Sequence, residues 1–134
     1  MIKISEAANL AIHALAYLGS LPPDTYTSAT IIAKKLNCSS SHLSKVLNGL
    51  AHQGILASRR GARGGFSLAV SKEEITTLEI IEAVDGPLPT SGCLLGQPIC
   101  SQNSCVFRDL FADLREQLVT RLGEVRLVDI PIHS

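Results

Sequence analysis

Apolar positions in the first fifty residues recur with the spacing of packed helices. Residues 4–19 carry apolar side chains on more than one face, which predicts a largely buried first helix, and the LPPD sequence that follows breaks it. Ser28 is a good N-cap for a second helix that we expect to end at Leu36. Its inward side chains are predicted to be Ile31, Ile32 and Leu36.

A third helix and then two short strands are expected next. Ser39 or Ser40 caps a helix that continues to about Gln53, and Gly54 ends it. The predicted inner stripe of this helix consists of Leu43, Val46, Leu47 and Leu50. The pattern then changes to strand candidates at 55–59 and 66–70, joined by the glycine-rich turn RGARGG. Two helices, a tight turn, a helix and a small hairpin are the order of a winged helix-turn-helix.

The second half of the chain predicts two more helices. Thr76 and Glu79 form a capping box for a fourth helix that ends near Asp85. Val106–Leu122 has the pattern of a long amphipathic helix. Its apolar stripe consists of Phe107, Leu110, Phe111, Leu114, Leu118 and Leu122. The pattern of this stripe is compatible with two roles, which are packing within the monomer and dimerisation.

The expected fold is therefore mainly α with a small β-hairpin wing. Its three parts would be a DNA-binding domain at 1–86, a cysteine-rich loop at 87–105, and a dimerisation helix with a tail at 106–134. The composition agrees, because 46% of residues are hydrophobic and only 4% are aromatic, which favours helices packed on helices.

The charge distribution points to a polyanion. Residues 27–72 contain seven Lys or Arg and no acidic residue, whereas residues 73–134 contain ten acids and four bases. Formal net charge is zero, so the split matters more than the total. The alternative, a solvated basic face with no partner, leaves seven cations without nearby anions. We therefore expect double-stranded DNA as the partner.

The start of the third helix and the hairpin turn hold the candidate DNA contacts. Small polar side chains on the first turn of a helix can reach base edges, and basic side chains hold phosphates. Arginines on a wing enter the minor groove or contact its phosphates. The predicted DNA-binding residues are Ser39, Ser40, Ser41, His42, Lys45, Arg59, Arg60 and Arg63, with Asn48 further along the helix.

Three cysteines precede the last predicted helix with the spacing C-x6-C-x4-C: Cys93, Cys100 and Cys105. Thiolates hold iron–sulfur clusters, and a Gly/Pro/Ser loop lets three of them converge. The spacing alone leaves zinc binding, thiol redox chemistry and incidental cysteines open. Cys38 stands apart and is expected to be a small buried hydrophobe.

The chain resembles the IscR- and NsrR-type bacterial regulators of the Rrf2 family. The likeness is carried by SSSHLSKVLNGLAHQGILASRRGARGGFSLA and by ITTLEIIEAVDG, and it extends over nearly the whole sequence. It implies a homodimer on a palindromic operator, formed through the long C-terminal helix. It also implies an iron–sulfur cluster on the three loop cysteines.

The fourth cluster ligand departs from the family patterns. The IscR-like pattern has a His where this chain has Arg108, and the NsrR-like pattern has an Asp where it has Asn9. A third pattern uses a Glu and a His four residues apart, and its His matches His13. Because imidazole ligates iron in Rieske-type centres, His13 is the predicted ligand, with Glu6 a weaker candidate. Three cysteines and one histidine as ligands favour a 2Fe–2S centre over a 4Fe–4S one.

We predict that the protein is a transcriptional regulator that acts as a repressor. An iron–sulfur cluster that senses redox state, nitric oxide or iron–sulfur supply would switch its affinity for the operator. A cluster-free regulator acting through thiols or a protein partner is the alternative. A redox enzyme is disfavoured because the sequence has no nucleotide-binding fingerprint. That interpretation would also leave the basic wing without a role. Since the first apolar run is interrupted by Glu6, Asn9 and His13, we expect no membrane segment and a cytoplasmic protein.

Overall fold

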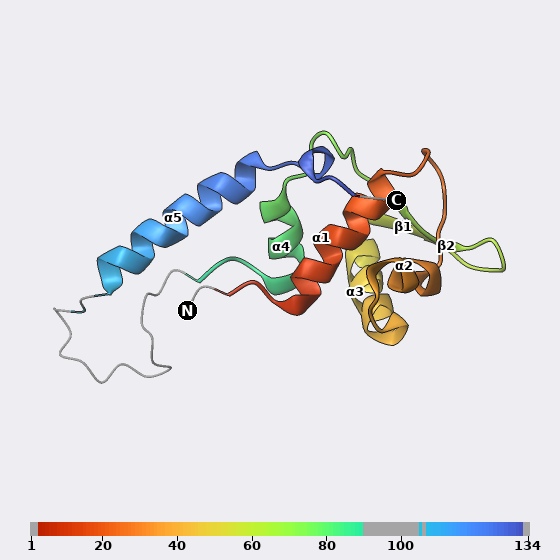
Figure 1. Cartoon of the computed structure of the whole chain (residues 1–134), viewed down its shortest axis with the longest axis horizontal. Helices are drawn as coiled ribbons and strands as arrows, with labels where there is room; N and C mark the ends of the chain where they lie inside the picture. The colour runs from red at the N-terminus through yellow and green to blue at the C-terminus, as the bar shows by residue number, and fades with distance from the viewer. Residues whose placement is uncertain (1–2, 90–104, 106, 133–134) are drawn as a thin grey trace.

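A computed structural model describes residues 3–89, 105 and 107–132 of the 134-residue chain. Helices and a two-stranded hairpin follow one another as the sequence predicts (Figure 1). The elements are α1 (Glu6–Gly19), α2 (Ala29–Leu36), α3 (Ser40–His52), β1 (Leu56–Arg59), β2 (Gly65–Leu68), α4 (Thr77–Asp85), α5 (Arg108–Glu124) and a 3-10 turn at Leu127–Asp129. The mainly helical winged helix-turn-helix fold is confirmed.

Side-chain caps fix where the four helices of the body begin. Ser5, Ser28, Ser39 and Thr76 each accept a hydrogen bond from the backbone N–H three residues further on. Such a cap satisfies one of the N–H groups that have no partner within the helix. The predicted starts at Ser28 and Thr76 are therefore confirmed, and Ser39 rather than Ser40 caps α3.

The core lies where α1 meets the other helices. α1 contacts α2, α3 and α4, and it buries Leu15 and four alanines completely or nearly so. Leu43, Leu47 and Leu50 of α3 are buried as predicted, and Val46 is half-buried. The prediction for Ile31 is wrong, because that side chain is 56% exposed. Its neighbours on α2, Ile32 and Ala33, occupy the core face instead.

The hairpin pairs with a third segment of chain. β1 and β2 are antiparallel, with Arg59 opposite Gly65. Thr27 also bridges Phe66: the Thr27 N–H donates to the Phe66 carbonyl at 2.9 Å, and the Phe66 N–H donates back at 2.8 Å. These bonds attach the wing to the segment that enters α2.

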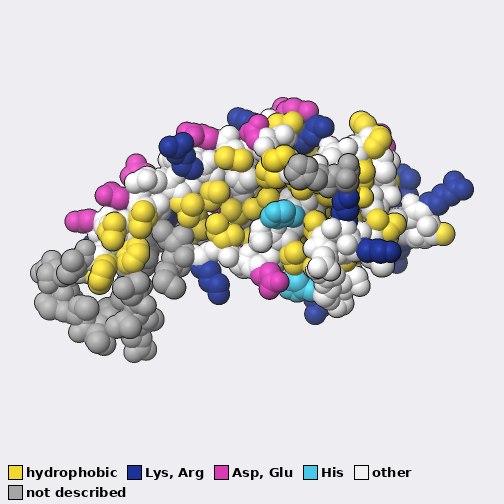
Figure 2. Space-filling view, viewed as in Figure 1, with side chains coloured by type: hydrophobic (Ala, Val, Ile, Leu, Met, Phe, Trp, Pro, Cys, Tyr) yellow, Lys and Arg dark blue, Asp and Glu magenta, His cyan; other side chains and the backbone are white. Residues whose placement is uncertain are grey.

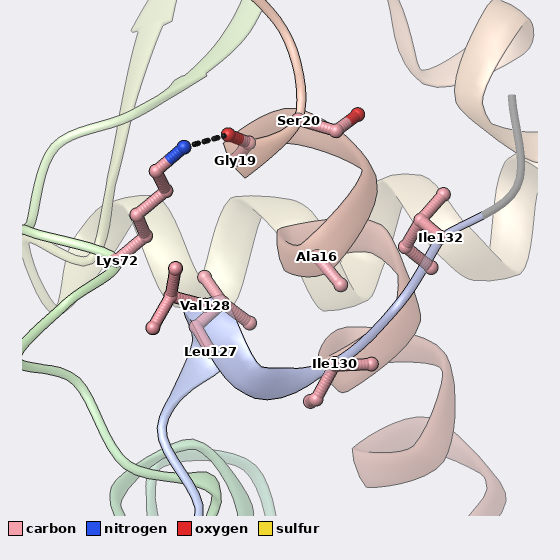
Figure 3. Close-up of a pocket in the computed structure, with 8 residues that line it drawn as sticks. All are labelled: Ala16, Gly19, Ser20, Lys72, Leu127, Val128, Ile130 and Ile132. Atoms are coloured by element: carbon pink, nitrogen blue, oxygen red, sulfur yellow. Dashed lines mark hydrogen bonds between the residues drawn. The ribbon is translucent and has the colours of Figure 1, made fainter.

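The tail folds back on α1, which the sequence did not indicate. Leu127 is buried in the core, and Ile130 and Ile132 pack against it (Figure 3). The Lys72 ammonium group donates to the Gly19 carbonyl at 3.1 Å, at the end of α1. A cation is favourable there because the helix dipole is negative at its C-terminus.

α5 extends away from the body at the end opposite the hairpin (Figure 1). It begins at Arg108 rather than Val106, which lies outside the described residues, as do residues 90–104 of the predicted cysteine loop. Half of the predicted stripe is exposed: Phe107, Leu110 and Leu114 are 45%, 52% and 44% exposed, whereas the other three stripe residues are partly buried. Acidic side chains line the outer edge of this helix (Figure 2).

Candidate nucleic-acid interface

The first turn of α3 presents its polar side chains to solvent. Ser40, Ser41, His42 and Lys45 are all exposed, as a recognition helix requires. Ser39 has a different role. Its hydroxyl oxygen accepts from the His42 backbone N–H at 3.4 Å and lies 3.0 Å from the Ser41 hydroxyl. Ser39 therefore orients the turn that carries the other candidates.

Glycines determine the shape of the wing. The turn closes with the Gly64 N–H donating to the Gly61 carbonyl at 2.9 Å, and Gly61 has a φ of +104°. A Cβ at Gly64 would collide with the Arg59 carbonyl, and one at Gly65 would collide with the backbone of Thr27. Only glycine allows the strands to approach this closely. Every arginine of the wing is exposed: Arg59, Arg60 and Arg63.

A groove of about 440 Å³ separates the second half of α3 from the wing. Asn48 and His52 of α3 line one side, and Ser58, Arg59 and Arg60 line the other. His52 was not among the predicted contacts, although it lies one helical turn after Asn48 on the same face. Helix and wing thus contribute polar side chains to one surface.

Exposed positive charge gathers at this end of the molecule. Lys34 and Lys35 on α2 are exposed, and Lys and Arg side chains gather at the hairpin end of the molecule (Figure 2). Because residues 27–72 contain no Asp or Glu, no carboxylate from the same segment neutralises them. Such a surface attracts a polyanion over distances of about one Debye length, ~8–10 Å.

Tyr26 is a second residue that sequence reasoning missed. The guanidinium carbon of Arg59 lies 4.1 Å from the centre of the Tyr26 ring. A tyrosine before the second helix gives no signal in the sequence, since the contact depends on how the hairpin pairs with Thr27.

The predicted cluster ligands are only partly described. Cys93 and Cys100 lie outside the described residues, and Cys105 is a half-buried free thiol just before α5. His13 is exposed on α1, and its Nδ1 lies 2.7 Å from the Asn9 carbonyl oxygen. Among residues 3–89, 105 and 107–132, no group of three potential metal ligands comes together.

His13 and Cys105 suit the chemistry of an iron–sulfur site. When Nδ1–H donates to a backbone carbonyl, the imidazole lone pair is on Nε2, which is the usual arrangement in histidine ligands. Arg108, at the position of the IscR-like histidine, is exposed, and its backbone N–H donates to the Cys105 carbonyl at 3.3 Å. Cys38 packs against the core as predicted, but it is only half-buried rather than buried.

Comparison with known proteins gives the family. Residues 4–131 match Rrf2, described as "Iron-dependent Transcriptional regulator". The chain belongs to the Rrf2 family. A protein of Aquifex aeolicus described as an HTH-type transcriptional regulator is 34% identical over 117 residues, covering 85% of this chain and 81% of the relative. NsrR of Halalkalibacterium halodurans is 27% identical, covering 85% of this chain and 83% of the relative.

Solved structures of Rrf2 regulators superpose along the chain. CymR (YrzC), the global cysteine regulator of B. subtilis, has a TM-score of 0.78 and 26% identity, covering 96% of this chain and 95% of the other. T. potens IscR has a TM-score of 0.74 and 20% identity, covering 96% of this chain and 85% of the other. At this identity the similarity supports the fold alone.

These findings confirm the predicted resemblance and identify a DNA-binding winged-helix transcriptional regulator. In the described part of the chain, no helix combines the length and apolar character that crossing a bilayer requires. The roles of individual DNA-binding and cluster residues stay predictions.

Proposed function

We propose that this Rrf2 regulator binds a palindromic operator as a homodimer through α3 and the wing, and that an iron–sulfur site on its cysteine loop controls the affinity. One observation carries the proposal. Ser40, Ser41, His42 and Lys45 of α3 and the three wing arginines are all exposed, and the segment that carries them contains no acidic residue. The expected direction of regulation is repression.

Each part of this surface has a distinct task. Ser40, Ser41 and His42 face base edges in the major groove, while Lys45 lies one turn further and takes a phosphate. Arg60 and Arg63 lie on the wing, where arginines contact the minor groove and its phosphates. The groove between α3 and the wing accommodates the DNA backbone between these contacts.

The apolar stripe of α5 supports a dimer. Phe107, Leu110 and Leu114 are about half exposed, which is unusual for large apolar side chains that share one helix face. A second copy of α5 would cover them. The two-fold symmetry of such a dimer matches a palindrome with half-sites about 34 Å apart.

Cys93, Cys100, Cys105 and His13 would hold the iron–sulfur cluster. When bound, such a cluster supplies a centre that reacts with oxidants and nitric oxide. Its influence on DNA binding would pass through α1, because α1 carries His13 and contacts α3 directly. The family's description as iron-dependent supports this reading.

Regulation by thiols without a cluster is the second candidate. It is favoured by the similarity to CymR of B. subtilis, the global cysteine regulator of that organism.

Anaerobic purification separates the two candidates. The cluster predicts a brown or red protein with iron and sulfide in equal amounts, lost in Cys100→Ser and retained in Cys38→Ser. Operator affinity should then change on exposure to air in the wild type and in Cys38→Ser only. A colourless, iron-free protein whose DNA binding still responds to diamide would establish the thiol alternative.

Charge removal tests the surface independently of the cluster. Arg60→Ala and Arg63→Ala should each weaken DNA binding, whereas Arg126→Ala should not. Arg126 is a suitable control because it is exposed in the tail, where its guanidinium donates to the Glu74 carbonyl at 2.8 Å. Equal losses in all three variants would refute the assignment of this surface.

A further inference from the structure

Arg59 differs from the other wing arginines because an aromatic ring supports it. Its guanidinium carbon is 4.1 Å from the centre of the Tyr26 ring, well within the ~6 Å at which a cation over a ring face is attracted. The second such contact among the described residues is looser: the Lys35 ammonium nitrogen is 6.0 Å from the Tyr17 ring centre. Tyr26 is half-buried and Arg59 is exposed.

The strand register explains why these two side chains meet. Arg59 lies opposite Gly65, and Thr27 lies opposite Phe66. Alternate residues of a strand point to the same face, so Arg59 and Tyr26 share a face and are diagonal neighbours across β2. On this face of β2, Gly65 lies opposite Arg59 and has no side chain and no room for one, and Ser67 is the next residue along the strand. Arg59 can therefore extend over β2 to the ring.

The Arg59 guanidinium over the Tyr26 ring still has hydrogen-bond donors available. Arginine carries five N–H groups in the plane of the guanidinium, and stacking on an aromatic face leaves the edge of that plane open. Arg59 also lines the groove between α3 and the wing, where the DNA backbone is proposed to lie. No acidic residue occurs in its segment to compete for these donors.

We infer that Tyr26 is a positioning residue for DNA binding, whose ring holds the Arg59 guanidinium ready to bind a backbone phosphate in this groove. The inference rests on the proposed DNA-binding surface and adds to it a residue outside α3 and the wing. A preset arginine loses less side-chain freedom on binding than a mobile one, so the ring improves affinity without touching DNA. Because phosphate is the target, the gain should be the same for every DNA sequence.

Three variants and their combination test the inference. Tyr26→Leu removes the ring, Tyr26→Phe keeps it, and Arg59→Ala removes the cation. The probe is a fluorescein-labelled duplex of mixed sequence, about 30 base pairs long, measured by anisotropy at several salt concentrations. Thermal unfolding midpoints of the free proteins show whether each variant is folded at the assay temperature.

Tyr26→Leu should weaken binding about two- to fivefold, because the Arg59 side chain must then lose more rotamer freedom when it binds the phosphate. Tyr26→Phe should bind as the wild type does. In the Arg59→Ala background, Tyr26→Leu should have no further effect. In the free protein, the ring should shift the Arg59 Nε proton upfield in the NMR spectrum, in the wild type and Tyr26→Phe only.

Two results would overturn the inference while leaving the proposed function standing. One is a folded Tyr26→Leu that binds the duplex as tightly as the wild type. The other is an equal loss from Tyr26→Leu with and without Arg59, which would mean that the ring acts through another group. A wild-type protein without affinity for the duplex would refute the proposed function, and the role of Tyr26 with it.

Discussion

Substituting Gly65 by alanine should destabilise the protein and detach the wing. Gly65 has a φ of +139°, a backbone conformation that L-residues rarely adopt, and an added Cβ would collide with the Thr27 backbone. The collision forces β2 away from Thr27, whose two hydrogen bonds to Phe66 are 2.9 and 2.8 Å long. The effect therefore combines backbone strain with the loss of two buried hydrogen bonds.

The expected size follows from these two contributions. A net backbone hydrogen bond contributes about 1 kcal/mol, and strain at a disfavoured φ costs about 1–3 kcal/mol. The free energy of unfolding should fall by about 3–5 kcal/mol, a large part of the ~5–15 kcal/mol typical of a domain. Urea denaturation followed by circular dichroism at 222 nm measures it.

Gly49 supplies a control of opposite sign. It lies within α3, and a Cβ there would meet nothing within 4 Å. Gly49→Ala should raise the free energy of unfolding by about 0.5–1 kcal/mol, because alanine favours the helix. If Gly65→Ala unfolds within about 0.5 kcal/mol of the wild type, the reasoning on the Thr27 bridge is wrong.

Three further predictions concern the α3 cap, the tail and α5. Ser39→Ala removes the α3 cap and should cost about 1 kcal/mol in urea denaturation, whereas Ser41→Ala should cost less; equal costs would contradict the capping role. Lys72→Met removes the ammonium bond to the Gly19 carbonyl and should lower stability by about 1–2 kcal/mol while leaving DNA affinity unchanged; a selective loss of DNA binding would refute its structural role. Leu114→Asp should convert the proposed dimer to a monomer in analytical ultracentrifugation, with Glu116→Ala as the control; an unchanged mass would place the interface elsewhere.

Local signals predicted most of the fold. Capping residues at Ser28 and Thr76, glycine at the end of α3 and the change of period after it are each readable within a few positions of the sequence. Helix interiors follow in the same way, since Leu43, Leu47 and Leu50 repeat at helical spacing and are buried. The prediction that Ile31 faces inward was wrong because a short helix with adjacent isoleucines does not indicate which of them faces the core.

Contacts between distant segments could not be predicted. The Thr27–Phe66 bridge, the packing of Leu127 on the core and the Tyr26–Arg59 contact each join positions that carry no mutual signal in one sequence. The candidate DNA surface was accessible to prediction because charge accumulates along a continuous segment. Tyr26 was missed because it joins that surface through tertiary structure alone. His52 was missed although its spacing from Asn48 on α3 puts both on one helix face.

The salt dependence of DNA binding tests the central claim most directly. If α3 and the wing bind duplex phosphates, the logarithm of the association constant should fall linearly with the logarithm of salt concentration. Each neutralised phosphate contributes about −0.9 to the slope, so a dimer that uses three or more cations per subunit should give about −5 or steeper. A slope near zero, or no affinity for any duplex at low salt, would contradict the account.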